Sequence, residues 1–231
     1  MISINQLKDY LLFAGLSENE LSALAPCLSK RTFAKGAYLF YPGGPSLNIY
    51  LVESGLIRAF FTNSAGQEFL INLYGPRSIV GLLLLREDQT RLGGAAALQP
   101  STVLVISQKD LNEFIQSNPR LMHNIYQAMD NEIRKLLLYA RGMATISLPG
   151  RIATALLYLT QTLASDNPNV LDLPVSQADF AALVGASRGA LNRALGRLQQ
   201  LGLIRVEGQK FIILDRTGLE RMTEDLLLDQ E

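Results

Sequence analysis

The stretch "VSQADFAALVGASRGALNRALGRLQQLGLIRV", residues 175–206, decides the fold of the C-terminal part of the chain. Ser176 can cap a first helix, and Asp179 three residues later can return the capping bond. Gly185 can end this helix in a left-handed turn, and Ser187 can cap a second helix directly after it. Two helices joined by a short glycine turn predict a helix-turn-helix.

The second helix, which Gly202 is expected to end, has two faces. At about 100° per residue, its leucines and alanines fall on one side and its polar N-terminal residues on the other. An arginine fork can pair with guanine and an asparagine amide with adenine when the N-terminal part of such a helix enters the major groove of DNA. We therefore predict that double-stranded DNA is bound by Ser176, Gln177, Ser187, Arg188, Gly189, Asn192, Arg193, Arg197 and Lys210.

The runs "LIRV" and "KFIIL" then flank the tight turn "EGQ", which predicts a two-stranded wing after the second helix. Arg197, Arg205 and Lys210 are expected to contact phosphates there and to give affinity that depends on salt and not on sequence. The whole chain has a net charge of zero, but residues 187–221 carry seven basic and three acidic residues, a local charge of +4. The alternative is an amphipathic helix whose arginines are only solvated; the caps, the turn, the polar face and the hairpin together favour DNA binding.

The N-terminal half has a different pattern. Residues 5–30 favour short helices, with Ser17 and Glu20 as a capping box. Residues 32–106 carry short β-prone runs about ten residues apart, with Gly, Pro, Asn and Ser at the breaks. This spacing is typical of an antiparallel sandwich or barrel, and "TNSAGQ", residues 62–67, is expected to be a hairpin turn.

After "SQKDLNEFIQSNPRL", residues 107–121, the chain has no Pro or Gly until Gly142, which predicts one central helix with bounds 118–143. Apolar residues recur on it at heptad spacing, as a two-stranded helical seam requires. The alternative is a helix that packs only on its own sandwich. Pro149 is then expected in the first turn of another helix, and "SDNPNVLDLP", residues 165–174, is expected to be a loop. The predicted dimer seam consists of Met122, Ile125, Met129, Ile133, Leu136, Ala140 and Met143.

Composition excludes several classes of protein. The longest apolar run has seven residues, "IVGLLLL", far below the roughly 18 that a membrane-spanning helix needs. The start of the chain shows no secretory signal, so we expect a cytoplasmic protein that is not bound to a membrane. The single cysteine, Cys27, and the single histidine, His123, exclude a disulfide framework, a four-cysteine cluster and a multi-histidine metal site within one chain. We expect no metal site, no catalytic residues and no cofactor.

The order of a β-rich domain, a long helix and a winged helix-turn-helix resembles the bacterial Crp/Fnr superfamily of transcription factors. The resemblance extends from "LFAGLSENELSAL" through "GLIRAFFTNSAGQEFLINLYGPRSIVG" and "GRIATALLYL" to the stretch quoted first. It implies an α+β protein: an N-terminal antiparallel β jelly roll similar to cyclic-nucleotide-binding domains (1–117), a long dimerisation helix (118–143) and a C-terminal winged helix-turn-helix domain (144–231). It also implies a homodimer that binds a pseudo-palindromic operator and has RNA polymerase as a further partner, with recognition helices about 34 Å apart.

Two features depart from the family's pattern. Ser187, Arg188 and Arg193 match the usual recognition helix, but Gly189 replaces a glutamate that could accept a hydrogen bond from cytosine. We therefore expect a different operator preference.

The effector pocket departs further. The resemblance implies a pocket formed by Gly81, Leu82, Leu83, Arg91 and Leu92. Leu82 takes the place of the glutamate that holds the ribose in cyclic-nucleotide-binding members, and Leu92 follows Arg91 where a hydroxyl is usual. Because these changes remove polar partners of a cyclic nucleotide, we expect that any effector is of another kind. The interior of the sandwich, rich in leucine and alanine, either admits an apolar ligand or is filled and binds no effector. Arg91 either holds another anion or pairs with Glu87 or Asp88.

Other members of the family offer no substitute effector. One cysteine cannot supply the cluster of the oxygen-sensing branch, and Cys27 is expected to be buried and inert. His123 is expected on the surface or in the seam and not as a haem ligand.

The leading hypothesis is a sequence-specific, homodimeric transcription regulator controlled by an unidentified signal. The main alternative is a dimeric signalling or scaffold module with a degenerate DNA-binding domain, which the zero net charge and Gly189 favour. An enzyme comes third, because metal-dependent chemistry in a jelly roll needs clustered histidines and carboxylates.

Overall fold

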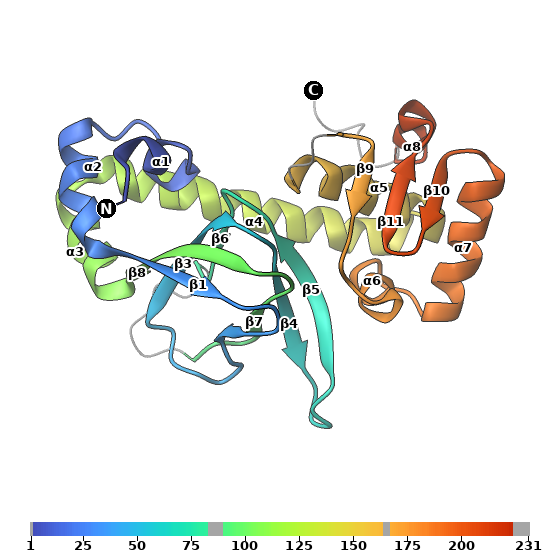
Figure 1. Ribbon diagram of the computed structural model, residues 1–231, viewed down its shortest axis with the longest axis horizontal. Coiled ribbons are helices and arrows are strands. Elements are labelled where there is room, and N and C mark those ends of the chain that lie inside the picture. The colour runs from blue at the N-terminus through green and yellow to red at the C-terminus, as the bar shows by residue number, and fades with distance from the viewer. Residues whose placement is uncertain (1, 83–89, 164–166, 224–231) are drawn as a thin grey trace. The chain divides into compact units, whose positions relative to one another are not determined.

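The computed structural model describes residues 2–82, 90–163 and 167–223 (Figure 1). The chain divides into two compact units: Met1–Glu68 with Leu73–Arg134, and Phe69–Asn72 with Lys135–Glu231. The boundary falls inside helix α4 (Pro119–Thr145), the predicted central helix, which therefore contributes residues to both units.

Short helices precede and follow the strands of the first unit. They are α1 (Ile4–Lys8), η1 (Leu11–Phe13), α2 (Glu18–Leu24), η2 (Ala25–Cys27) and α3 (Gln108–Ser117). The predicted capping box is confirmed, because Ser17 Oγ accepts from the Glu20 amide and Glu20 Oε2 accepts from the Ser17 amide at 2.7 Å. Leucines of these helices pack with Leu121 and Ile125 of α4 in one apolar core. This burial holds the first turns of α4 against the helices.

Two four-stranded sheets form a sandwich, as the ten-residue spacing predicts. Every strand pair with a described register is antiparallel. One sheet has the order β1 (Leu28–Phe33), β8 (Ser101–Ser107), β3 (Asn48–Ser54), β6 (Ile79–Val80), and the other has the order β2 (Tyr38–Phe40), β7 (Gly94–Ala97), β4 (Ile57–Thr62), β5 (Glu68–Tyr74).

Side chains from both sheets fill the interior of the sandwich. Tyr50 of β3 is 5% exposed, and its hydroxyl donates to the Leu39 carbonyl of β2 at 3.0 Å. The buried residues of this core are Leu39, Tyr50, Val52, Ile57, Val80, Ala95, Ala97, Val103 and Val105.

The turns of the sandwich also follow the sequence pattern. Asn63 and Gln67 close the predicted hairpin turn through the Asn63 amide and the Gln67 carbonyl at 3.0 Å. Gly55 has φ +93°, and a Cβ there would lie 2.2 Å from Ser101 Oγ, so no larger residue fits this turn.

Apart from Phe69–Asn72 of β5, the second unit starts with the last turns of α4 and continues with α5 (Leu148–Thr162). Ser147 caps α5, which has Pro149 in its first turn as predicted. Its remaining elements are β9 (Val170–Asp172), α6 (Gln177–Leu183), α7 (Arg188–Gln200), β10 (Ile204–Glu207), β11 (Lys210–Ile213) and α8 (Arg216–Arg221). Strands β10, β11 and β9 form one antiparallel sheet.

One expectation about this unit is wrong. Residues 170–172 do not belong to a loop, because they form β9 and pair with residues 210–212 of β11. A strand of three residues is too short to show an alternating pattern, and the neighbouring Asn and Pro residues suggest a loop.

Candidate functional site

Helix α6 and the turn after it have the predicted local structure. Ser176 Oγ accepts from the Asp179 amide at 3.0 Å, and Asp179 Oδ2 accepts from the Ser176 hydroxyl at 2.7 Å. Gly185 follows the helix with φ +63°, a left-handed conformation that favours glycine. The Ala186 amide donates to the Ala181 carbonyl at 2.8 Å and so closes the turn.

Helix α7 begins at the predicted cap and divides into the two predicted faces. Ser187 Oγ accepts from the Ala190 amide at 3.2 Å. One face of the helix is buried in the second unit and consists of Leu191, Ala194, Leu195 and Leu198. The residues of this helix that are predicted to bind DNA are all exposed, and they are Arg188, Gly189, Asn192, Arg193 and Arg197. The buried leucines therefore hold the helix so that its arginines face solvent.

Gln177 joins the two helices of the motif. Its Oε1 accepts from Arg188 Nε at 3.3 Å and from Asn192 Nδ2 at 3.5 Å. Arg188 and Asn192 thus both lie within hydrogen-bond distance of Gln177, and all three residues predicted to bind DNA are exposed. The sequence places Gln177 in the set but does not show these bonds, because the two helices must first pack together.

The wing lies next to α7, as Figure 1 shows for β10 and β11. Lys210 lies at the start of β11, opposite Glu207 in the register of the hairpin, and is exposed. Arg205 Nη1 lies 3.5 Å from Glu207 Oε1, so this arginine is partly neutralised before any partner binds. Lys210 has no ion pair among the described residues, which leaves its charge available to a phosphate.

The effector region brings two of its five predicted residues together. Arg91 is 5% exposed and donates from Nη1 to the Gly81 carbonyl at 3.1 Å and from Nη2 to the Asn48 carbonyl. Its guanidinium carbon lies 4.1 Å from the centre of the Phe40 ring. Burial lowers the pKa of Arg91. Of its donor atoms, only the buried Nε has no hydrogen-bond partner within the described part of the chain.

Two of the other predicted pocket residues, Leu82 and Leu92, do not join them. Leu82 is buried in the core between the short helices and the first sheet. Leu92 is 77% exposed, so it does not line an interior pocket. For a single apolar residue beside a turn, the sequence does not show whether the side chain points into the protein or toward solvent. Leu83 lies outside the described residues, and so do Glu87 and Asp88, the predicted acidic partners of Arg91.

Helix α4 has a partly exposed apolar face. Ile133 is 49% and Leu136 53% exposed; Ala140 is also exposed, and Met122 and Met129 are half-buried. Two predicted seam residues lie elsewhere. Ile125 is 1% exposed in the core of the first unit, and Met143 packs against Gly185 of the helix-turn-helix. A heptad pattern does not distinguish a dimer seam from a helix packed on its own domain, because both need apolar residues at this spacing.

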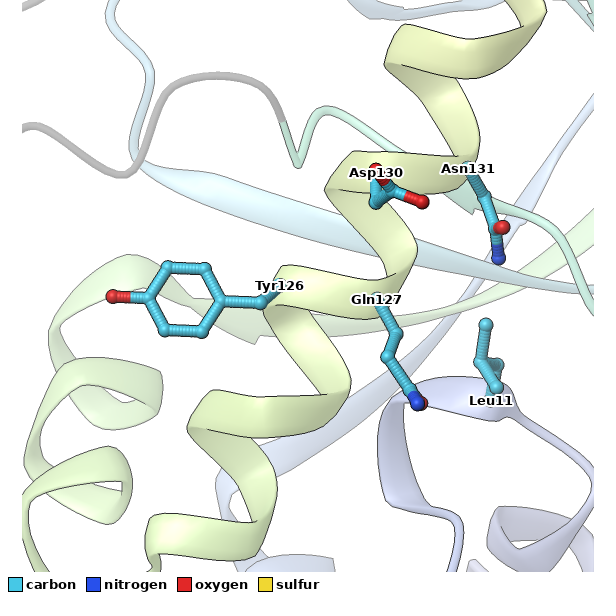
Figure 2. A pocket seen from close by; sticks show the side chains of 5 residues that line it. All are labelled: Leu11, Tyr126, Gln127, Asp130 and Asn131. Carbon is cyan, nitrogen blue, oxygen red and sulfur yellow. The ribbon is translucent and has the colours of Figure 1, made fainter.

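A shallow pocket lies beside this face in the first unit. Leu11, Tyr126, Gln127, Asp130 and Asn131 line it, and Figure 2 shows Gln127 and Asn131 on the side of Leu11 and Tyr126 extending away from it. Its polar residues lie on the flank of the helix, so the apolar face itself is not part of the pocket.

Two family models match the chain. The Crp-like helix-turn-helix domain matches residues 150–222, and the cyclic nucleotide-binding domain matches residues 30–118. The chain belongs to the Crp/Fnr family of transcription regulators. Members of this family bind DNA and are not enzymes, so the protein is a DNA-binding transcription regulator of the Crp/Fnr type.

Relatives of this Crp/Fnr regulator are matched over most of their length. A "CRP-like cAMP-activated global transcriptional regulator" of Mycobacterium tuberculosis is 26% identical over 91% of this chain and 95% of its own. An "Anaerobic regulatory protein" of Bacillus subtilis is 27% identical over 88% of this chain and 87% of its own. The structure of a Crp/Fnr-family regulator from Thermus thermophilus is similar with a TM-score of 0.71, at 25% identity over 85% of this chain and 98% of its own.

Among residues 2–82, 90–163 and 167–223, no helix is long and apolar enough to cross a membrane. The same residues contain no group of three or more His, Cys, Asp or Glu side chains that could hold a metal ion.

Proposed function

We propose that this Crp/Fnr regulator acts as a homodimer, reads a two-fold symmetric DNA site with helix α7, and responds to a signal other than a cyclic nucleotide. The observation that carries the proposal is the exposed row of Arg188, Asn192 and Arg193 above the buried leucines of α7. Arginine forks and an asparagine amide match the hydrogen-bonding edges of guanine and adenine in the major groove.

The homodimer is supported by the apolar face of α4. Ile133, Leu136 and Ala140 share one side of the helix and are exposed in the single chain. Such a row loses contact with water when a second copy of the helix packs along it. Two copies related by a two-fold axis would present two α7 helices to successive major grooves.

A different effector is supported by the way Arg91 is used. Its terminal nitrogens donate to the chain's own carbonyls of Gly81 and Asn48, and Tyr50 fills the sandwich next to Phe40. A cyclic phosphate would need donors that these carbonyls already occupy, and Leu82 offers no acceptor for a ribose. The relatives' names point to different signals, since one is described as cAMP-activated and another as anaerobic.

Two further assignments follow from a role in bacterial transcription. We place the regulator in the cytoplasm, where the DNA of its bacterial relatives lies. RNA polymerase is a further partner, because a regulator bound beside a promoter acts by contacting or excluding the polymerase.

Selection of random duplex DNA by the purified chain without added ligand tests the proposal. We expect enrichment of a two-fold symmetric site, together with a melting temperature that does not change when cyclic AMP or cyclic GMP is added. DNA retained without an enriched motif would mean either that the signal required for specific binding is missing or that the DNA-binding domain is degenerate, as in the scaffold alternative. A clear rise in melting temperature with either nucleotide would overturn the assignment of the effector.

A further inference from the structure

Arg151, in the first turns of α5, joins three backbone carbonyls of the second unit. Its Nε donates to the Val184 carbonyl at 3.0 Å and its Nη2 to the Gly185 carbonyl at 3.3 Å. Its Nη1 donates to the carbonyl of Ile146, just after α4 ends, at 3.2 Å. Carbonyls at the end of a helix have no partner within the helix, so one planar guanidinium satisfies groups at the end of α6 and at the end of α4 together.

The other side of the same turn is filled by α4. A Cβ built on Gly185 would lie 1.6 Å from Met143 Cε and 2.6 Å from Met143 Sδ. The methionine therefore occupies the space beside the backbone of the turn. Arg151 and Met143 hold the turn through different contacts, hydrogen bonds for the arginine and packing for the methionine.

This turn sets where the recognition helix begins. Ser187, the cap of α7, follows Gly185 by two residues, and Arg188 comes next. Any shift of the turn moves the N-terminal residues of α7, which are those that reach base edges. None of the three carbonyls bound by Arg151 belongs to a residue predicted to contact DNA.

We propose that Arg151 is a positioning residue for DNA recognition, which fixes the turn of the helix-turn-helix against the end of α4 without contacting DNA. The proposal rests on the proposed function and adds a residue that the sequence pattern does not single out. Arg151 lies 33 residues before Val184, so only the folded unit brings them together. Loss of the guanidinium would leave α7 folded but less well placed.

The substitution Arg151→Lys tests this, because lysine keeps the charge but cannot reach three carbonyls with one planar group. The matched control is Arg216→Lys, which alters an arginine that pairs with Glu220 within α8. Each variant is titrated with the selected duplex and with a scrambled duplex at several salt concentrations. For Arg151→Lys we expect about tenfold weaker binding to the selected site, with unchanged binding to the scrambled duplex and an unchanged salt slope, whereas the control matches the unmodified protein.

A second measurement needs no DNA and separates this proposal from the proposed function. Amide hydrogen exchange of Gly185 and Ala186 is expected to be about tenfold faster in Arg151→Lys, with unchanged exchange at Phe211 in the wing. Unchanged exchange at the turn would overturn the positioning role even if the DNA site is specific. An equal loss of affinity for both duplexes, together with a smaller salt slope, would also overturn the positioning role, since Arg151 would then be a phosphate contact. If the wild-type protein selects no site, the exchange rates of Gly185 and Ala186 alone decide whether Arg151 is a positioning residue.

Discussion

Arg188 Nε donates to Gln177 Oε1 at 3.3 Å, across the two helices of the helix-turn-helix. An arginine can only donate, so the atom of the Gln177 amide that faces it must be the oxygen. Within the described part of the chain, the two terminal nitrogens of Arg188 and the amide nitrogen of Gln177 have no partner. The bond therefore orients Arg188 and leaves its fork available to a base.

Gln177→Ala is expected to weaken binding to the selected site by a factor of about two to five. One exposed hydrogen bond contributes about 0.5–1 kcal/mol, and here it holds Arg188 in place instead of making the specific contact itself. Gln200→Ala, at the exposed end of α7, is the control and is expected to bind like the unmodified protein. Equal affinities for the two variants would show that the Gln177 contact does not matter in solution.

Gly189 leaves open space at the start of the recognition helix. A Cβ there would meet only Arg193 Nη1, at 3.7 Å. Gly189→Ala is therefore expected to raise the free energy of unfolding by about 0.5–1 kcal/mol through helix propensity, measured by urea denaturation. Gly189→Glu adds an acceptor for cytosine N4 and is expected to change the selected base at one position of each half-site. An unchanged motif would mean that residue 189 does not face the bases.

Lys210→Ala is expected to weaken binding to every duplex by a similar factor. A lysine that neutralises one phosphate contributes no sequence information, so the slope of log affinity against log salt should fall by about one. Titration of the selected and scrambled duplexes over a range of salt concentrations measures both quantities. A loss confined to the selected site would instead make Lys210 a base contact.

Leu136→Asp is expected to raise the dissociation constant of the dimer by at least about tenfold, because it places a charge within the apolar face of α4. Sedimentation of dilute protein measures this change. Asn131→Asp adds the same charge on another side of the helix and serves as the control. If both variants sediment like the unmodified protein, the apolar face is not the dimer interface.

Gly81→Ala is expected to destabilise the first unit more than Gly36→Ala. Both glycines have a left-handed backbone, with φ +87° and φ +83°, and share a cost of about 1–2 kcal/mol. Only at Gly81 would the new Cβ also approach Arg91 Nη1, at 2.5 Å, whereas Gly36 has open space. The difference between the melting temperatures of the two variants measures the destabilisation caused by the close approach to Arg91. Equal melting temperatures would show that this approach costs no stability.

Local patterns predict much of this protein. The caps at Ser176 and Ser187, the turn at Gly185 and the wing depend on neighbours in the sequence, and the structure confirms each. Strand β9 could not be predicted, because it is too short to carry an alternating pattern.

Contacts between distant residues mark the limit of such prediction. Ile125 and Leu136 fit the same heptad, yet one is buried in the first unit and the other is exposed. The carbonyl partners of Arg91 and Arg151 cannot be predicted from the sequence either. Every residue has a backbone carbonyl oxygen, so only the folded chain shows which of them lie beside each arginine.

The central claim is that α7 reads DNA sequence through Arg188. It is tested most directly by the ratio of affinities for the selected and the scrambled duplex, measured for the unmodified protein and for Arg188→Ala. The account predicts that the variant loses about 1–3 kcal/mol on the selected site and much less on the scrambled one, so the ratio falls by about tenfold or more. An equal loss on both duplexes would contradict the account, because Arg188 would then contact only the phosphate backbone.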